Sequence, residues 1–353
     1  MVRSCTGWAA EDRRRARIDT RTTRRQQQAA STRSRRRRGL AVGAVALAVG
    51  ATAASLAVDR DPRRDPGQGA SPAAQPAATP PAATQPVATT TTLPPPPELP
   101  RGGRKLFPDY TVVGFYGMQN LDVLGAGPPD VVAQRLLKVA RPYARPSRPV
   151  MPMFELIATV AHPFPTPSGL YRTHQEDEIV QGFLKAVRTI DGLLVLDVQP
   201  GRDDFVAAVR HWERYLREPD VGIALDPEFA MGPGQVPGKH LGRTNAAAIN
   251  EASAYVAGIV RRHRLPQKLF MIHQFHDSMM RDKAKVAIRP GLAMAWNADG
   301  FGVRSAKLED YRSYTRDRRF HPGLKLFYEN DVNLMSPREV MRLKPPPRVV
   351  NYQ

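Results

Sequence analysis

From about residue 110 onward, short apolar runs alternate with longer segments of helical spacing, and this alternation restricts the possible folds more than any other feature of the sequence. Eight of the runs are apolar nearly throughout and are followed by turn residues, which is typical of buried strands. Seven segments between them have helical spacing, including a short one near Ser278–Ala287. The predicted strands are Thr111–Tyr116, Val150–Leu156, Gly192–Val198, Val221–Asp226, Lys268–Gln274, Gly291–Asn297, Gly323–Tyr328 and Arg348–Tyr352.

Strands that are apolar on both faces and separated by helices indicate a parallel sheet that is covered on both sides. Eight such strands within about 250 residues predict an α/β fold of the (β/α)8 type, a TIM-like barrel. The barrel is expected to lack its last helix, because the eighth strand reaches almost to Gln353. An open, doubly wound sheet is the alternative, but no G-x-G-x-x-G motif follows the first strand.

Three segments of very different composition precede this domain. Residues 1–38 contain thirteen Arg and three acidic residues, which predicts a disordered basic tail. Residues 39–58 carry no charge and are long enough to cross a membrane as one helix, and the Arg excess before them predicts a cytoplasmic N-terminus. Residues 59–107 are rich in Pro, Ala and Thr and predict an extended linker. We therefore expect a single-pass signal anchor with an extracytoplasmic domain at 108–353; a cleaved signal peptide is the alternative.

Charge and cysteine content exclude several classes of function. The formal net charge is +19, and part of this excess belongs to the N-terminal tail rather than to the outer domain. A nucleic-acid partner is not expected, because the outer domain is predicted to lie outside the cytoplasm. The only cysteine is Cys5, so the outer domain has neither disulfides nor thiol chemistry. The site described below is predicted to work without a cofactor or a metal ion.

Polar residues gather at the C-terminal ends of the predicted strands, where (β/α)8 barrels carry their active sites. Asp226 and Glu228 follow directly on an apolar run, and buried acids are costly unless they are paired, bound or used in chemistry. The N-terminal ends of the same strands carry no such set. The residues expected to contact a substrate are Tyr116, Glu155, Gln199, His273, Gln274, Trp296, Asn297 and Tyr328.

Two carboxyl groups on either side of a bond are the usual apparatus of glycoside hydrolysis. Glu228 is predicted to be the general acid/base and Glu329 the nucleophile. Asp197, Asp226 and Asp299 are expected to orient or tune them. The two glutamates resemble those of retaining barrel glycoside hydrolases in placement only, since those enzymes usually have Asn-Glu where this chain has Asp-Pro-Glu. The Asp-x-Glu spacing is also similar to the paired acids of barrel muramidases.

Two other functions fit the same residues. Asp197, Asp226, Glu228, His273 and Asp299 could form an oxygen-rich site for a divalent cation, as in metal-dependent phosphodiesterases on barrels. Without catalysis, the same mouth would bind a glycan or peptide of the cell envelope. A glycoside hydrolase-like activity is the favoured prediction, and the expected partner is a cell-envelope polysaccharide or peptidoglycan.

The outer domain also resembles a family of exported actinobacterial proteins, which are often lipoproteins or membrane-tethered. The resemblance covers about residues 110–353. It implies export and a barrel, and it supplies no reaction. Asn297-Ala298-Asp299-Gly300 stands where relatives have His-Met-Asp-Gly, and an apolar segment stands where many have a lipid-attachment Cys. The runs that carry the resemblance are VVGFYG, MPMFELIATVA, GLLVLDVQPGRDDF, VGIALDPEFAMGPGQ, LPQKLFMIHQF, YENDVNLMSP and VVNYQ.

Overall fold

The computed structural model of the protein describes residues 94–353. The predicted basic tail, the predicted membrane anchor at 39–58 and most of the predicted linker lie outside the described residues. Within 94–353, no helix is both long enough and apolar enough to cross a membrane.

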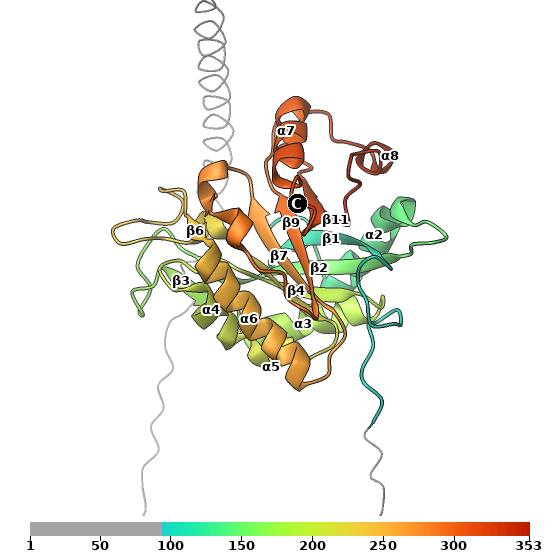
Figure 1. Cartoon of the computed structure of the whole chain (residues 1–353), viewed down its shortest axis with the longest axis horizontal. Coiled ribbons are helices and arrows are strands. Elements are labelled where there is room, and N and C mark those ends of the chain that lie inside the picture. Colours follow the sequence, from blue (N-terminus) through green and yellow to red (C-terminus); the bar gives the residue numbers. More distant parts are fainter. Residues whose placement is uncertain (1–93) are drawn as a thin grey trace, which may run out of the picture. The chain divides into compact units, whose positions relative to one another are not determined.

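Eight parallel strands form a closed barrel, which confirms the predicted TIM-like fold (Figure 1). Their order around the ring follows their order in the chain, and β1 closes the ring by pairing with both β2 and β11. All eight strands lie where the apolar runs predicted them. The barrel strands are β1 Thr111–Gly117, β2 Val150–Ala161, β4 Leu193–Val198, β5 Val221–Leu225, β7 Lys268–Gln274, β9 Leu292–Ala298, β10 His321–Leu326 and β11 Val349–Tyr352.

Helices follow most of the barrel strands and pack on their outer faces. Figure 1 shows α4, α5 and α6 grouped on one side of the ring, and α7 and α8 follow β9 and β10. After β11 the structure describes one further residue, Gln353. The α-helices are α2 Pro129–Ala140, α3 Asp177–Arg188, α4 Phe205–His211, α5 Glu213–Leu216, α6 Ala246–Arg262, α7 Arg304–Tyr314 and α8 Pro337–Val340.

The helix predicted near Ser278–Ala287 is wrong. Two 3-10 turns, Asp277–Met279 and Lys283–Lys285, flank the short strand β8 (Met280–Arg281), which pairs with β6 (Thr244–Asn245). Asp282 between them has a φ of 50°, and one residue in this left-handed conformation interrupts a right-handed helix. The remaining short elements are β3 Arg172–His174, antiparallel to β2, and the 3-10 turns Arg141–Tyr143 and Pro227–Phe229.

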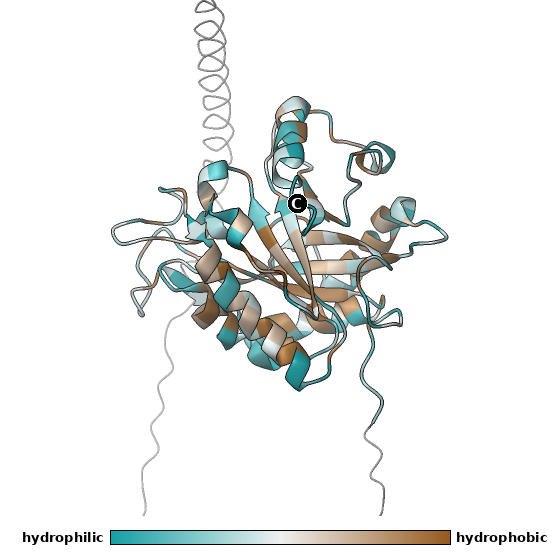
Figure 2. Ribbon diagram, viewed as in Figure 1, coloured by the Kyte–Doolittle hydropathy of each residue, from teal (hydrophilic) through white to brown (hydrophobic). Residues whose placement is uncertain are grey.

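The apolar core has two parts, one outside and one inside the ring. Side chains on the outer face of the strands, such as Phe154 and Phe270, pack against the helices. Inside the ring, the N-terminal half is filled by residues that alternate along the strands, for example Met151 and Met153 on β2. Figure 2 shows the apolar strands at the centre and polar residues on the exposed sides of the helices. Each fully buried aliphatic or Phe side chain stabilises the fold by about 1.5–3 kcal/mol.

The N-terminal end of the barrel is covered by the segment that enters it. Leu99, Leu106 and Phe107 are buried against the apolar layer inside the ring. The side-chain amide oxygen of Gln267 accepts the backbone N–H groups of Leu106 and Phe107 at 2.9 and 3.0 Å. The compact unit begins at Pro95. Leu99, Leu106 and Phe107 therefore belong to this unit, although the composition of 59–107 predicted a linker.

Candidate active site at the C-terminal end of the barrel

The two-residue repeat of a strand decides which side chains point into the ring. On β2, Met151 and Met153 lie in the apolar layer, so Glu155 is the next inward residue. On β7, Met271 is in the same layer and His273 comes next. Repeating this on every strand gives a polar layer above the apolar one. It consists of Tyr116, Glu155, Asp197, Asp226, His273, Asn297, Lys325 and Asn351, all at most 4% exposed.

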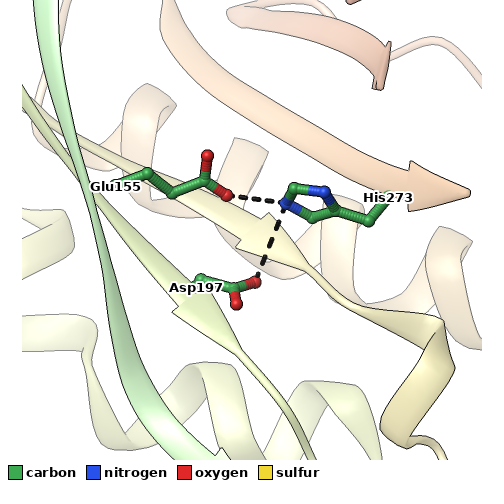
Figure 3. A group of neighbouring side chains, drawn as sticks. All are labelled: Glu155, Asp197 and His273. Atoms are coloured by element: carbon green, nitrogen blue, oxygen red, sulfur yellow. Dashed lines mark hydrogen bonds and ion pairs between the residues drawn. The ribbon is translucent and has the colours of Figure 1, made fainter. Parts of the chain in front are cut away.

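His273 stands at the centre of this polar layer (Figure 3). Its Nε2 atom lies 2.6 Å from Oε1 of Glu155 and 4.0 Å from Oδ1 of Asp197, and both carboxylates point toward the imidazole in the figure. The other oxygen of Glu155, Oε2, accepts a hydrogen bond from the side-chain amide of Asn351. Strands β2, β4, β7 and β11, which are far apart in sequence, thus meet around one imidazole.

Asp299, just after β9, links the histidine to a buried lysine. Its Oδ2 lies 3.0 Å from Nδ1 of His273, and its Oδ1 lies 3.3 Å from Nζ of Lys325. The Lys325 ammonium also sits over the ring of Tyr116, 3.3 Å from the centroid, which is a favourable cation–π position. The hydroxyl of Tyr116 donates to Asp197 Oδ2 at 3.1 Å, so the layer is connected on all sides.

Local charges decide which groups in this layer are ionised. Burial opposes a charged imidazole, but the carboxylates of Glu155 and Asp299 outweigh it and raise the pKa of His273 well above its usual value. Burial likewise lowers the pKa of Lys325, but the carboxylates of Asp299 and Glu155 raise it by more, so the pKa of Lys325 lies above its usual value. For Asp299, burial raises the pKa, whereas Lys325 and His273 together lower it below the usual value.

The pKa values of Asp197 and Asp226 are raised, in contrast to that of Asp299. Burial is the largest effect on both, and it raises the pKa of Asp197 well above its usual value, with His273 opposing and Asp226 adding to the rise. Burial also raises the pKa of Asp226 to about 7, again opposed by His273 and supported by the neighbouring charge of Glu228. Near neutral pH the layer therefore holds both protonated and ionised carboxyl groups, which acid–base chemistry requires.

The turn after β5 carries the acids that the sequence singled out. Pro227–Phe229 is a 3-10 turn, and the Asp226 side chain caps it by accepting the backbone N–H of Glu228 at 3.1 Å. Proline suits the first position of such a turn because its fixed φ is already helical. Asp226 is consequently turned inward with 3% exposure, while Glu228 is half-buried.

Other predicted site residues lie elsewhere. Glu329 is exposed on the loop after β10 and makes no hydrogen bond or ion pair with any residue from 94 to 353, and the exposed Tyr328 stacks on Tyr352. Trp296 points out of the ring into the helix-covered core, where its Nε1–H donates to Oε1 of Gln274 at 2.6 Å. Trp296 and Gln274 thus bind each other behind the wall of the barrel, and the structure does not bring them into the polar layer.

Gln199 lies at the edge of the polar layer. It follows β4, and its side chain accepts the backbone N–H of Ala161 at 3.1 Å and donates to the hydroxyl of Tyr116 at 3.4 Å. Lys325 was not among the predicted site residues, although the sequence carries a signal for it. Lys325 is a single charge between Leu324 and Leu326 in a buried strand, which is where a lysine needs a buried partner.

Three residues of the polar layer are of the types that bind metal cations. The ligand atoms of Glu155, Asp197 and His273 all lie within 4.8 Å of one another, and all three residues are buried. Two carboxylates and an imidazole are common ligands for divalent transition metals.

The fold and this layer define the protein as a (β/α)8 barrel with a charged, buried site at the C-terminal end of its strands. No known protein family and no curated protein matches the chain. It is similar to a solved D-allulose 3-epimerase from Methylomonas sp., at 11% identity and a TM-score of 0.35, over 70% of this chain and 85% of that one. It is also similar to Plasmodium falciparum HPPK-DHPS with pteroate, at 10% identity and a TM-score of 0.30, over 62% of this chain and 37% of that one. Neither likeness carries an argument about chemistry.

Proposed function

We propose that this barrel is a carbohydrate-active enzyme of the cell envelope that cleaves a glycosidic bond by acid catalysis at the C-terminal end of β5. One observation carries the proposal: Asp226 is buried beside the half-buried Glu228, and its pKa is raised to about 7. A carboxyl group that still holds a proton at neutral pH, beside a second and more exposed carboxyl group, gives the pair the proton that an acid catalyst needs.

In this proposal the two acids have different tasks. Glu228 is the catalytic residue, because it is the more exposed of the two and can reach a sugar at the mouth of the barrel. It gives a proton to the oxygen of the leaving sugar and takes one back from water. Asp226 is a positioning residue: it holds the turn through the Glu228 backbone N–H, and the charge of Glu228 helps to raise its pKa, so the two groups titrate as a pair.

The second carboxylate of the reaction stays a prediction. Glu329 was expected to be the nucleophile. Its exposed loop follows β10, three strands around the ring from β5, which carries Glu228. Asp197 and Asp299 belong to the buried layer and are proposed to set its charge rather than to touch the sugar. The substrate is proposed to be a cell-envelope polysaccharide or peptidoglycan, with the segment 39–58 anchoring the protein in the membrane.

The test uses the purified full chain and follows the release of new reducing ends from actinobacterial cell-wall polysaccharide and peptidoglycan. Release should fall by about 10²–10⁴-fold in Glu228→Gln, which is the usual contribution of a general acid or base. Glu251→Gln is the matched control, because Glu251 is exposed on α6, away from the strand ends. Retention on these polymers without any release by the parent protein would make this a glycan-binding protein and end the proposal.

A further inference from the structure

We infer that the polar layer contains a binding site for a divalent transition-metal ion, formed by Glu155, Asp197 and His273, and that Mn²⁺ suits its donor set best. The inference goes beyond the proposed function, since it concerns different residues of the same layer and stands without Asp226 or Glu228. A bound cation would polarise an oxygen of a molecule that enters the mouth.

The three side chains are already arranged as ligands. Nε2 of His273 lies 2.6 Å from Oε1 of Glu155 and 4.0 Å from Oδ1 of Asp197. Ligand atoms that share a cation at roughly 2.1–2.2 Å lie about 3–4.4 Å apart. The three ligand atoms here lie within 4.8 Å of one another, so small side-chain shifts would bring them to coordination distance. The three residues come from β2, β4 and β7, and rigid strands hold such groups more accurately than loops do.

A buried acceptor without a donor supplies the second, independent observation. Oδ1 of Asp197, which faces His273, is buried and receives no hydrogen bond from any residue in 94–353. The whole Asp197 side chain is fully buried. An unsatisfied buried acceptor costs about 1–3 kcal/mol, and a cation bound at this oxygen satisfies it.

The environment of His273 is that of a metal ligand. Asp299 lies 3.0 Å from Nδ1 on the side of the ring away from Glu155 and Asp197. Histidines that bind metals usually give their other N–H to a carboxylate, which fixes the ring and leaves the free nitrogen facing the ion. With Nδ1–H held by Asp299, Nε2 is the atom that would meet the cation, and binding would displace the proton that Nε2 shares with Oε1 of Glu155.

The donor set selects the kind of ion. Carboxylate and carboxamide oxygens with one imidazole suit Mn²⁺ and neighbouring transition metals, whereas Mg²⁺ and Ca²⁺ favour oxygen-only sites. No thiolate is available in residues 94–353, which disfavours soft ions.

The experiment titrates the chelator-stripped full chain with Mn²⁺ and follows the loss of the free-ion signal by electron paramagnetic resonance, with Mg²⁺ as a second probe. One Mn²⁺ per chain is expected, bound more tightly than Mg²⁺. Asp197→Asn and His273→Gln should each weaken binding by about 100-fold or more, beyond what loss of an outer partner of a ligand usually costs. Asp226→Asn, the matched control, removes a carboxylate from the same layer but not a ligand, and should change the affinity by less than about tenfold.

Circular dichroism and thermal unfolding establish that each variant is folded, and two ligand variants keep the test decisive if one of them fails. Absence of uptake at millimolar Mn²⁺ by the folded parent overturns the inference, and so does equal affinity in parent, Asp197→Asn and His273→Gln. Mn²⁺ binding without glycan cleavage supports the metal site and counts against the proposed function. Glycan cleavage by a chelator-stripped protein that takes up no Mn²⁺ supports the proposed function and counts against the metal site.

Discussion

Asp299 holds His273 from the side opposite Glu155: its Oδ2 lies 3.0 Å from Nδ1, while its Oδ1 faces the ammonium of Lys325 at 3.3 Å. One carboxylate therefore compensates two buried cationic groups from different strands. Because all three side chains are at most 8% exposed, water cannot replace this carboxylate if it is removed. The stability of the barrel and the arrangement of its polar layer thus depend on the same residue.

Replacing Asp299 with Asn should destabilise the fold by about 3–5 kcal/mol, because it leaves the Lys325 charge without its partner in the interior. Urea unfolding of the purified protein measures this loss. Asp282→Asn is the control: its ion pair with Lys285 is exposed and 3.8 Å long, so its loss should cost less than about 1 kcal/mol. Equal, small losses for both variants would show that the Asp299–Lys325 pair contributes little.

Asp226 should make the protein less stable as the pH rises. Its folded-state pKa is raised to about 7, so the folded protein binds a proton that the unfolded chain releases near pH 4. The contribution is therefore present below pH 4 and is lost as the pH rises toward 7. Asp226→Asn keeps the bond to the Glu228 N–H and removes the ionisation, so at pH 8 it should be more stable than the parent by roughly 2–4 kcal/mol.

This difference should fall below about 0.5 kcal/mol near pH 4, where Asp226 is protonated in the folded state and about half protonated in the unfolded chain. Thermal unfolding of both proteins with a chelator present, between pH 4 and pH 8, gives the comparison. A constant difference across this range would mean that Asp226 does not titrate as described.

Trp296→Phe tests the finding that this side chain belongs to the core. The substitution leaves Oε1 of Gln274 without its donor and removes part of the packing against Phe320, so it should cost about 1–3 kcal/mol. Retention on envelope polysaccharide should stay unchanged, because the indole faces away from the mouth. A loss of polysaccharide retention in a stable variant would mean that Trp296 contacts the substrate after all.

Leu106→Ala tests whether the entering segment belongs to the barrel core. Leu106 is fully buried in the apolar layer, so its truncation should cost about 2–5 kcal/mol in chemical unfolding. Lys105→Ala changes the exposed neighbouring residue and should shift the free energy of unfolding by less than about 0.5 kcal/mol. Similar effects of the two substitutions would mean that the segment is only loosely attached.

The barrel could be predicted from the sequence because its strands are buried on both faces, so each one is an uninterrupted apolar run. The structure of Ser278–Ala287 could not be predicted in the same way. Its apolar spacing indicates a helix, but Asp282 adopts a left-handed conformation and β8 pairs with β6. The start of the domain was missed for a compositional reason. Leu106 and Phe107 follow a Pro-rich stretch, and only the tertiary structure shows what they pack against.

The candidate site was predicted in part, since position at a strand end does not tell which way a side chain points. Glu155, Asp197, His273 and Asn297 point inward, whereas Trp296 is one residue out of phase and points into the helical layer. The two-residue alternation from the apolar layer upward separates these cases, and it also identifies Lys325. The sequence cannot supply the pairing of Asp299 with both His273 and Lys325, because it depends on the closure of the ring.

That closure joins β1 to β11, whose paired residues Val112 and Val349 lie more than 230 positions apart in the chain. Contacts so distant in sequence form late in folding, because the intervening loop must first lose its entropy. Until then an open sheet leaves Asp197 hydrated, and Asn351 has not yet met Glu155. Burial raises the pKa of Asp197 well above its usual value, so the cost of dehydrating its carboxylate falls on the last folding step. Refolding should therefore be slower at pH 8 than at pH 5, as stopped-flow fluorescence can measure. Slower refolding at pH 8 would mean that a charge lining the mouth of the barrel also limits the rate at which the ring closes.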